Sequence, residues 1–183
     1  MSPHKPFLDY IYLFIVALHL VGMLGIDFVP FYPQSLSQPR GSPFHFLVAF
    51  RQWYITTFSD PYYGIDIPGH FFEFLVYVEL VVQFPLAIYL TRALLSKQKM
   101  SAPAELAGVI YGAVVGLCTA VVCNDMWYLG SEFINREAKQ TLLGIYLPYA
   151  VIRKLHHLAT LMLLDMQKRL LARLHRLSEI KQE

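Results

Sequence analysis

Two acidic residues lie inside or near the end of long apolar stretches, where carboxyl groups are uncommon. Glu79 lies within the apolar run Phe71–Leu95, and Asp27 lies near the end of the run Tyr10–Val29. An acid at the centre of a membrane-spanning helix costs roughly 2.5–3.5 kcal/mol on insertion scales. Two carboxyl groups that share a site away from water cannot easily both ionise. We therefore expect one to keep its proton and the other to attract a cation or accept a ligand hydroxyl group.

A glutamine and a proline follow Glu79 at positions that favour a polar site. Gln83 comes four residues after Glu79, so both side chains lie on one face of a helix. Pro85 lacks the N–H that would bond the carbonyl of Val81, which opens the backbone there. The pattern predicts a polar site that faces the interior of a helix bundle. The alternative is an amphipathic helix with no such site.

Other polar residues in apolar runs have two interpretations each. His19 precedes Asp27 by eight residues, on a similar helix face, and is either a ligand group or a helix–helix hydrogen bond. Asp27 itself either faces Glu79 or caps its helix end. Tyr146 and Tyr149 flank Pro148, where a kink can aim them at a cavity. Otherwise they belong to an aromatic belt at the membrane surface.

The composition indicates a membrane protein. Of 183 residues, 56% are hydrophobic and only 15% are charged, which is too apolar for an ordinary soluble domain. The net charge of +2 gives no indication of nucleic-acid binding. No cofactor fingerprint or nucleophile motif occurs. Cys118 and Cys123 are five residues apart without matching ligands, so no metal site is expected.

The apolar runs predict an all-α membrane protein with a bundle of four transmembrane helices. The expected spans are Tyr10–Val29, Phe71–Leu95, Ala104–Cys123 and Thr141–Leu164. They form one domain, residues 1–183, with a core of about 7–165 and a basic C-terminal tail, 166–183. Asn124-Asp125 is expected to end the third span. In that span Gly108, Gly112 and Gly116 permit close helix approach.

Two further features concern the membrane surface. The stretch Phe44–Phe58 has helical spacing, with Arg51, Trp53 and Tyr54 near its centre, and is expected to be an interfacial helix. Lysine and arginine are concentrated in Thr91–Pro103 and in the C-terminal tail. Cytosolic loops carry such an excess, so both chain ends are expected in the cytosol.

Four motifs, spread over roughly Phe7 to Leu164, resemble those of the EXPERA family, and within it the sigma-2 receptor branch. The motifs are His19 with Asp27; Phe50-Arg51-x-Trp53-Tyr54 leading to Phe58-x-Asp60-Pro61; Glu79-Leu80-x-x-Gln83-x-Pro85; and Tyr146-x-Pro148-Tyr149 with Asp125. The third motif is the most specific. The family also includes the emopamil-binding sterol isomerases.

The resemblance implies a multi-pass protein of the endoplasmic-reticulum membrane, whose intramembrane cavity takes sterols and cationic amphiphiles. It further implies that Asp27 pairs with a ligand amine while Glu79 hydrogen-bonds to Asp27. The expected ligand-binding residues are Asp27, Glu79, His19, Gln83, Tyr149 and Tyr146. The residues expected to shape the cavity are Asp60, Trp53, Pro85 and Asp125. A homodimer and contacts with membrane lipids are compatible with the family.

The role stays open between three classes. The favoured one is a binding protein in sterol or lipid homeostasis or trafficking. The alternatives are a sterol Δ8–Δ7 isomerase and a purely structural assembly factor, whose buried acids would join helices. Two departures from the family are visible. Arg153-Lys154-Leu155-His156-His157 interrupts the fourth apolar run, as an insertion or as an early end of the span. The lysine-rich C-terminal retrieval signal of the sigma-2 receptor is absent from the tail.

Overall fold

Helices form every regular element in the part of the chain that the structure, a computed structural model, describes: residues 6–63, 70–149 and 158–180. In chain order the elements are α1 (Phe7–Gly22), η1 (Met23–Asp27), η2 (Val29–Phe31), α2 (Gln34–Ser37), α3 (His45–Phe58), η3 (Pro61–Tyr63), α4 (Phe71–Val78), η4 (Glu79–Gln83), α5 (Phe84–Leu95), α6 (Ala102–Tyr128), α7 (Arg136–Tyr146), η5 (Leu147–Tyr149) and α8 (Leu158–Ile180). The predicted all-α class is confirmed.

Three continuous helical stretches are long and apolar enough to cross a membrane. They are Phe7–Asp27, Phe71–Leu95 and Ala102–Tyr128. The second has the same bounds as the predicted span. Large apolar side chains such as Phe14, Val81 and Leu117 point away from the protein and are about two-thirds exposed. Such a surface is stable next to lipid tails and costly next to water, so the fold is that of a multi-pass membrane protein.

The third span is longer than the sequence pattern predicts. Asn124-Asp125 does not end it, because α6 continues to Tyr128. An aspartate stops a helix when its side chain competes for nearby backbone groups. Here Asp125 Oδ2 instead accepts a hydrogen bond from the Tyr62 hydroxyl at 2.8 Å. A tertiary contact therefore satisfies the side chain and leaves the helix intact.

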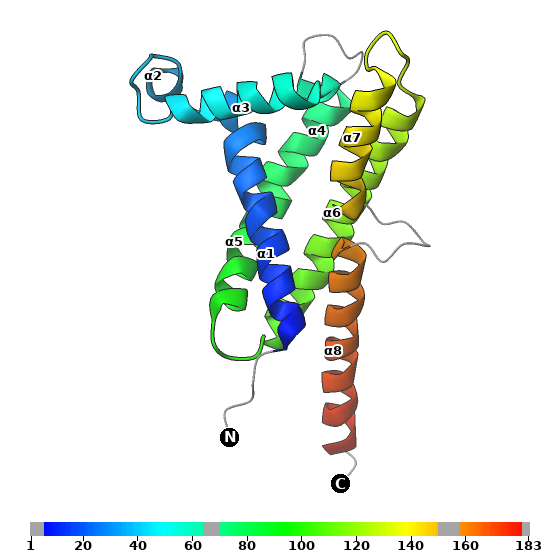
Figure 1. Cartoon of the computed structure of the whole chain (residues 1–183). Helices are drawn as coiled ribbons and strands as arrows, with labels where there is room; N and C mark the ends of the chain where they lie inside the picture. Colours follow the sequence, from blue (N-terminus) through cyan, green and yellow to red (C-terminus); the bar gives the residue numbers. More distant parts are fainter. Residues whose placement is uncertain (1–5, 64–69, 150–157, 181–183) are drawn as a thin grey trace.

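Two helices occupy the place where a fourth span is predicted. The predicted run Thr141–Leu164 corresponds to the C-terminal half of α7, η5 and the start of α8. Both α7 and α8 pack along α6, one above the other (Figure 1). The interruption Arg153–His157 lies outside the described residues. A single fourth membrane-spanning helix remains a prediction.

The glycine face of α6 receives α8. A Cβ atom at Gly108 would lie 3.0 Å from Met166 Cγ and 3.3 Å from Met162 Cε. Both methionines are fully buried. The close helix approach predicted for this glycine is thus confirmed. The predicted boundary between core and tail, at 165/166, falls within α8, and the helix continues across it into the packed bundle.

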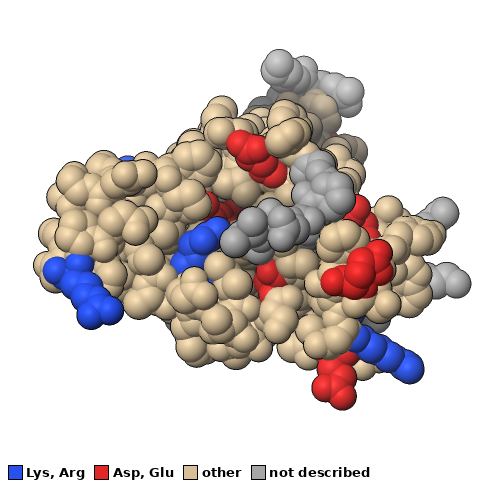
Figure 2. Space-filling model, turned by 90° about the horizontal axis from the view of Figure 1, so that it is seen from above, with Lys and Arg blue, Asp and Glu red and all other residues tan. Residues whose placement is uncertain are grey.

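One end of the bundle is covered by α3, and the opposite end carries the start of α1 and the end of α8. Figure 1 shows α3 lying across the tops of α1 and α4, while α1 begins and α8 ends at the bottom. On the face seen from above, charged side chains are scattered among uncharged ones (Figure 2). Placement of α3 at a membrane surface remains a prediction.

Candidate functional site

A cavity of about 410 Å³ lies between the upper halves of the helices, beneath α3. It is lined by parts of α1, α3, α4, α6 and α7 and by the turns η1, η3, η4 and η5. Its wall is mainly aliphatic and aromatic, including Leu18, Ile26, Phe72, Leu75 and Val122. Cavities of 300–1,000 Å³ with such walls and a few polar groups are typical of small-molecule sites. This cavity is therefore the candidate ligand site.

Both predicted acids line the cavity, and both sit on widened helical turns. Asp27 is the last residue of η1, and Glu79 is the first residue of η4. In η1 the backbone N–H of Phe28 donates to the carbonyl of Met23, five residues earlier. In η4 the backbone N–H of Phe84 donates in the same way to the carbonyl of Glu79. Pro85 follows η4, as expected for a backbone opened by a missing N–H. Such π-helical turns are frequent at functional sites.

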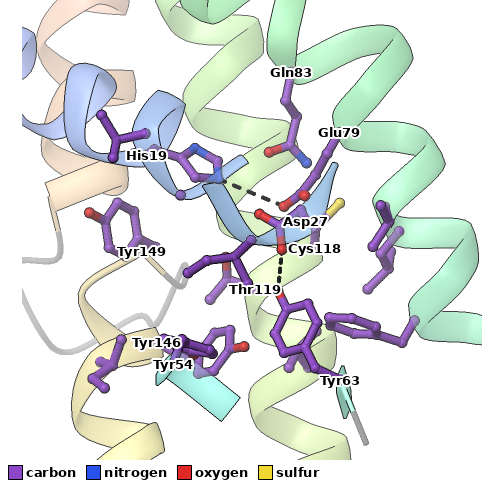
Figure 3. Close-up of a pocket in the computed structure, with 18 of the residues that line it drawn as sticks. His19, Asp27, Tyr54, Tyr63, Glu79, Gln83, Cys118, Thr119, Tyr146 and Tyr149 are labelled. Atoms are coloured by element: carbon purple, nitrogen blue, oxygen red, sulfur yellow. Dashed lines mark hydrogen bonds and ion pairs between the residues drawn. The ribbon is translucent and has the colours of Figure 1, made fainter. Parts of the chain in front are cut away.

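The two carboxyl groups point into the same part of the cavity (Figure 3). The carboxylate of Asp27 accepts a hydrogen bond from the Tyr63 hydroxyl. Burial raises the pKa of Tyr63 well above its usual value, so the hydroxyl keeps its proton as the donor. Among the described contacts, no hydrogen bond joins Glu79 directly to Asp27. The interpretation in which Asp27 caps a helix far from Glu79 does not fit this geometry.

His19 connects Glu79 to the third span. Its Nε2 atom lies 3.7 Å from Glu79 Oε1, and its Nδ1 atom lies 2.6 Å from the Tyr111 hydroxyl of α6. The His19 ring also contacts Tyr149 of η5, with ring centroids 5.8 Å apart. Thus both interpretations of His19 apply: it joins helices and it faces the cavity.

Some polar atoms at this site lack partners. Glu79 Oε2 and both amide atoms of Gln83 are buried without a hydrogen bond, although Cys118 lies close enough to Gln83 to interact with it. Gln83 is only 1% exposed. Each unsatisfied buried group of this kind costs about 1–3 kcal/mol. A ligand that supplies a hydroxyl, amine or carbonyl group would remove part of this cost.

The charge of the cavity wall is negative or neutral. In the described part of the chain, no lysine or arginine lines the cavity. Arg51 is the nearest relevant cation, but its Nε atom bonds the carbonyl of Ile26, and its guanidinium lies 5.4 Å from the Tyr63 ring centre. Asp27 and Glu79 are therefore the acidic groups of a cavity wall without a lysine or arginine, an arrangement that suits a cationic ligand.

A second layer of polar contacts holds the upper wall. Asp60 is 2% exposed and accepts hydrogen bonds at 2.9 Å from Tyr54 of α3 and Tyr146 of α7. It also accepts one from the backbone N–H of Tyr62 at 3.0 Å. Burial raises the pKa of Asp60, against the opposing effect of these hydrogen bonds. Asp60 therefore joins α3 and α7, which each contribute a tyrosine to the cavity.

The predicted site residues divide into two groups. Those expected to bind ligand all line the cavity: His19, Asp27, Glu79, Gln83, Tyr146 and Tyr149. Those expected to shape it, Asp60, Trp53, Pro85 and Asp125, lie outside its lining. Asp60 and Asp125 hold tyrosine hydroxyls, and Pro85 follows η4. Trp53 is about half exposed and stacks on Phe50.

Several cavity residues were not predicted. Tyr63 lies in a short turn after Asp60-Pro61, where no periodicity indicates a side-chain direction. Cys118, considered in the sequence only as a metal ligand, lines the cavity together with Thr119. Tyr111 lies outside the cavity lining but bonds His19, which lines it. The signal for this contact in the sequence is a tyrosine hydroxyl within an apolar span.

The fold and the site define an α-helical, multi-pass membrane protein with an acidic intramembrane cavity. Comparison with protein families identifies the group. The family model for EXPERA, the expanded EBP superfamily, matches residues 46–166, and the chain belongs to this family. A comparison with curated proteins gives no significant match. The matched region contains Glu79, Gln83 and both cavity tyrosines of the last predicted motif, whereas His19 and Asp27 precede it.

Proposed function

We propose that the protein binds a sterol or a cationic amphiphile in the intramembrane cavity. The observation that carries this proposal is the combination of an apolar wall with two acids and an unpaired amide. A rigid apolar ligand would fill the wall, and a single polar group would meet Asp27, Glu79 or Gln83. A cationic ligand is favoured there because carboxylates attract a cation more strongly in a medium of low dielectric constant than in water.

Family membership and the composition of the cavity wall support a proposal for the cellular role. We propose that the protein lies in the endoplasmic-reticulum membrane and acts in sterol or lipid homeostasis or trafficking. The motif of His19 and Asp27 in the first span supports a protein similar to the sigma-2 receptor branch of the family. Homodimer formation, which the family resemblance implies, belongs to the same proposal.

Substitution of Asp27 tests the binding function. Asp27→Asn removes the charge and keeps the shape, so high-affinity binding of a radiolabelled cationic amphiphile should be lost in a protein that still folds. Glu73→Gln is the matched control, because Glu73 lies on α4, is 59% exposed at its side chain and is not part of the cavity. Unchanged binding by Asp27→Asn would overturn the role given to Asp27.

A second candidate function is isomerisation of a sterol double bond. The observation that favours it is the contact of His19 with both Glu79 and Tyr111, since linked titratable groups can move protons. Such an enzyme would protonate one ring carbon and remove a proton from another. Incubation of the purified protein with a Δ8-sterol, followed by product analysis, distinguishes the two. A Δ7 product that disappears in His19→Ala would establish turnover, and no product would leave binding as the function.

A further inference from the structure

A second cavity lies at the other end of the bundle, where α1 begins and α8 ends. Its volume is about 330 Å³, and it shares no residue with the first cavity. It is formed by the α5–α6 loop, the start of α6, the residue before α1 and the C-terminal half of α8. Its lining includes Pro6, Lys99, Met100, Glu105, Arg173 and Arg176. Cations therefore outnumber acids in this wall.

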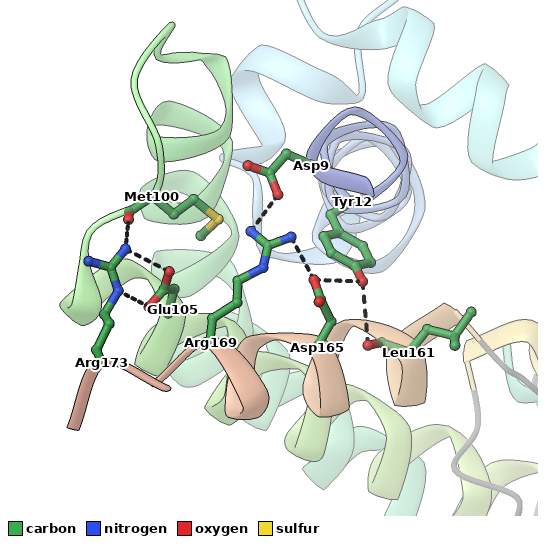
Figure 4. A network of polar contacts seen from close by, with 8 residues as sticks. All are labelled: Asp9, Tyr12, Met100, Glu105, Leu161, Asp165, Arg169 and Arg173. Atoms are coloured by element: carbon green, nitrogen blue, oxygen red, sulfur yellow. Dashed lines mark hydrogen bonds and ion pairs between the residues drawn. The ribbon is translucent and has the colours of Figure 1, made fainter. Parts of the chain in front are cut away.

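The inner part of the second cavity is fixed by ion pairs. Arg173 of α8 donates from Nε and Nη2 to both oxygens of Glu105, at 2.7 and 2.9 Å, and Nη2 also bonds the carbonyl of Met100. Beside it, Arg169 bonds Asp9 at 2.7 Å and Asp165 at 2.6 Å (Figure 4). Glu105 and Asp9 are almost completely buried. These pairs hold α8 against α1 and α6 and make a rigid floor.

Two cations in the outer wall of the cavity take no part in these ion pairs. Lys99 and Arg176 are both exposed, and neither has a carboxylate partner among the described residues. They belong to different elements, the α5–α6 loop and α8, and both line the cavity. Two such cations, at a pocket whose floor is held in place, provide a positively charged opening for an anion.

The position of this cavity along the membrane-spanning helices indicates which kind of anion it binds. The first span begins at Phe7, the second ends at Leu95 and the third begins at Ala102, all at this end of the bundle. A pocket lined by Pro6, Lys99 and Glu105 therefore lies at the level of the lipid headgroups. The lysine and arginine bias predicts that this end faces the cytosol, where the leaflet contains anionic lipids.

We propose that the second cavity binds the phosphate group of an anionic phospholipid. Lys99 and Arg176 contact the phosphate oxygens, and Arg173 stays on Glu105 and shapes the floor. Basic pockets between membrane helices on the cytoplasmic side are suited to phospholipid headgroups. A free phosphate has the same chemistry, but it lacks the acyl chains that would lie along the apolar outer surface of the spans. The inference is independent of the ligand proposed for the first cavity.

Titration with phosphatidic acid tests the proposal, because its headgroup is a phosphate alone. The full chain in a neutral detergent is titrated with phosphatidic acid, and bound lipid is counted by native mass spectrometry. The double variant Lys99→Gln/Arg176→Gln should weaken binding of the first lipid by roughly thirtyfold, from the loss of two cations near the surface. Phosphatidylcholine serves as the zwitterionic comparison and should bind without a preferred first site.

A matched control uses two other cations of the same elements. Lys97 lies on the α5–α6 loop and Lys168 lies on α8; both are exposed and neither lines the cavity. Lys97→Gln/Lys168→Gln changes the net charge equally and should keep the lipid. If both double variants lose the same affinity for phosphatidic acid, the effect is general charge attraction and the proposed site is wrong. If neither variant loses affinity, the proposed site is wrong as well.

Inorganic phosphate separates the two sources of the anion. In calorimetric titrations without lipid, it should bind far more weakly than phosphatidic acid. If it binds as tightly, the cavity takes a free phosphate and the lipid assignment is wrong. Thermal unfolding shows that each variant is folded, and the unfolding temperature should not change.

Discussion

His19 of α1 and Glu79 of η4 approach to 3.7 Å between Nε2 and Oε1, while the second nitrogen of the same imidazole meets Tyr111 of α6. One ring thus links the three membrane-spanning stretches at the height of the candidate ligand site. The contact also holds one Glu79 oxygen and leaves the other, Oε2, buried without a partner. The position of Glu79 in the cavity therefore depends on helix packing as well as on its own turn.

Substitutions of Glu79 should show a definite order. Glu79→Gln keeps a polar group beside His19 and the volume of the side chain, so fold and much of the ligand binding should persist. Glu79→Ala removes the group that lies 3.7 Å from the imidazole and leaves a void. It should therefore cost more stability, about 2–5 kcal/mol as for large-to-small substitutions in a packed interior, with weaker binding. Thermal unfolding and ligand affinity measure both effects. The interpretation fails if the two variants behave alike.

Removal of the Tyr63 hydroxyl tests how Asp27 is held. Tyr63→Phe deletes the donor to Asp27 and should weaken binding of a cationic amphiphile by about 1 kcal/mol, roughly fivefold, the usual value of one hydrogen bond. Tyr128→Phe is the control, because Tyr128 is 79% exposed and lies outside the cavity. Equal affinities of the wild type and Tyr63→Phe would show that this hydroxyl does not position the carboxylate.

The raised pKa of Asp60 predicts a pH dependence of stability. Burial favours the protonated carboxyl in the folded chain, so the folded state holds this proton more tightly than the unfolded state does. The free energy of unfolding should therefore fall as the pH rises from about 4, the usual pKa of Asp, towards the folded-state pKa. Asp60→Asn should remove this part of the slope in thermal unfolding between pH 4 and 7.

The control for that experiment is Glu132→Gln, since Glu132 is exposed in the loop before α7. In Glu132→Gln the free energy of unfolding should depend on pH as it does in the wild type. If the pH dependence also stays unchanged in Asp60→Asn, this carboxyl group ionises at the same pH in the folded and unfolded states.

The orientation of the chain can be measured with glycosylation-acceptor tags. A tag within Ser35–Gly41 should be modified, because this segment lies at the α3 end, which the lysine and arginine bias places in the lumen. A tag after Gln182 should remain unmodified. In the structure α1 begins and α8 ends at the same end of the bundle, as this predicted orientation requires. The reverse pattern of modification would invert the predicted orientation.

The sequence by itself determined the features that depend on local pattern. Length and apolarity define the span Phe71–Leu95, because a helix must satisfy its own backbone in lipid. The cost of intramembrane carboxyl groups singles out Asp27 and Glu79 in the sequence, and both line the cavity. Pro85 indicates an opened backbone, which the structure shows as the turn η4. Each inference needs information only from residues within a few turns.

Only the tertiary structure decided which polar side chains meet. Tyr63 reaches Asp27 from a loop 36 residues away, and Tyr146 reaches Asp60 across 86 residues. The sequence predicts a helix end at Asp125, but its side chain bonds Tyr62 and α6 continues to Tyr128. Arg169 lies in the predicted tail but pairs with the buried Asp9 at the other end of the chain. Such pairs depend on how whole helices pack, and local periodicity carries no information about partners distant in sequence.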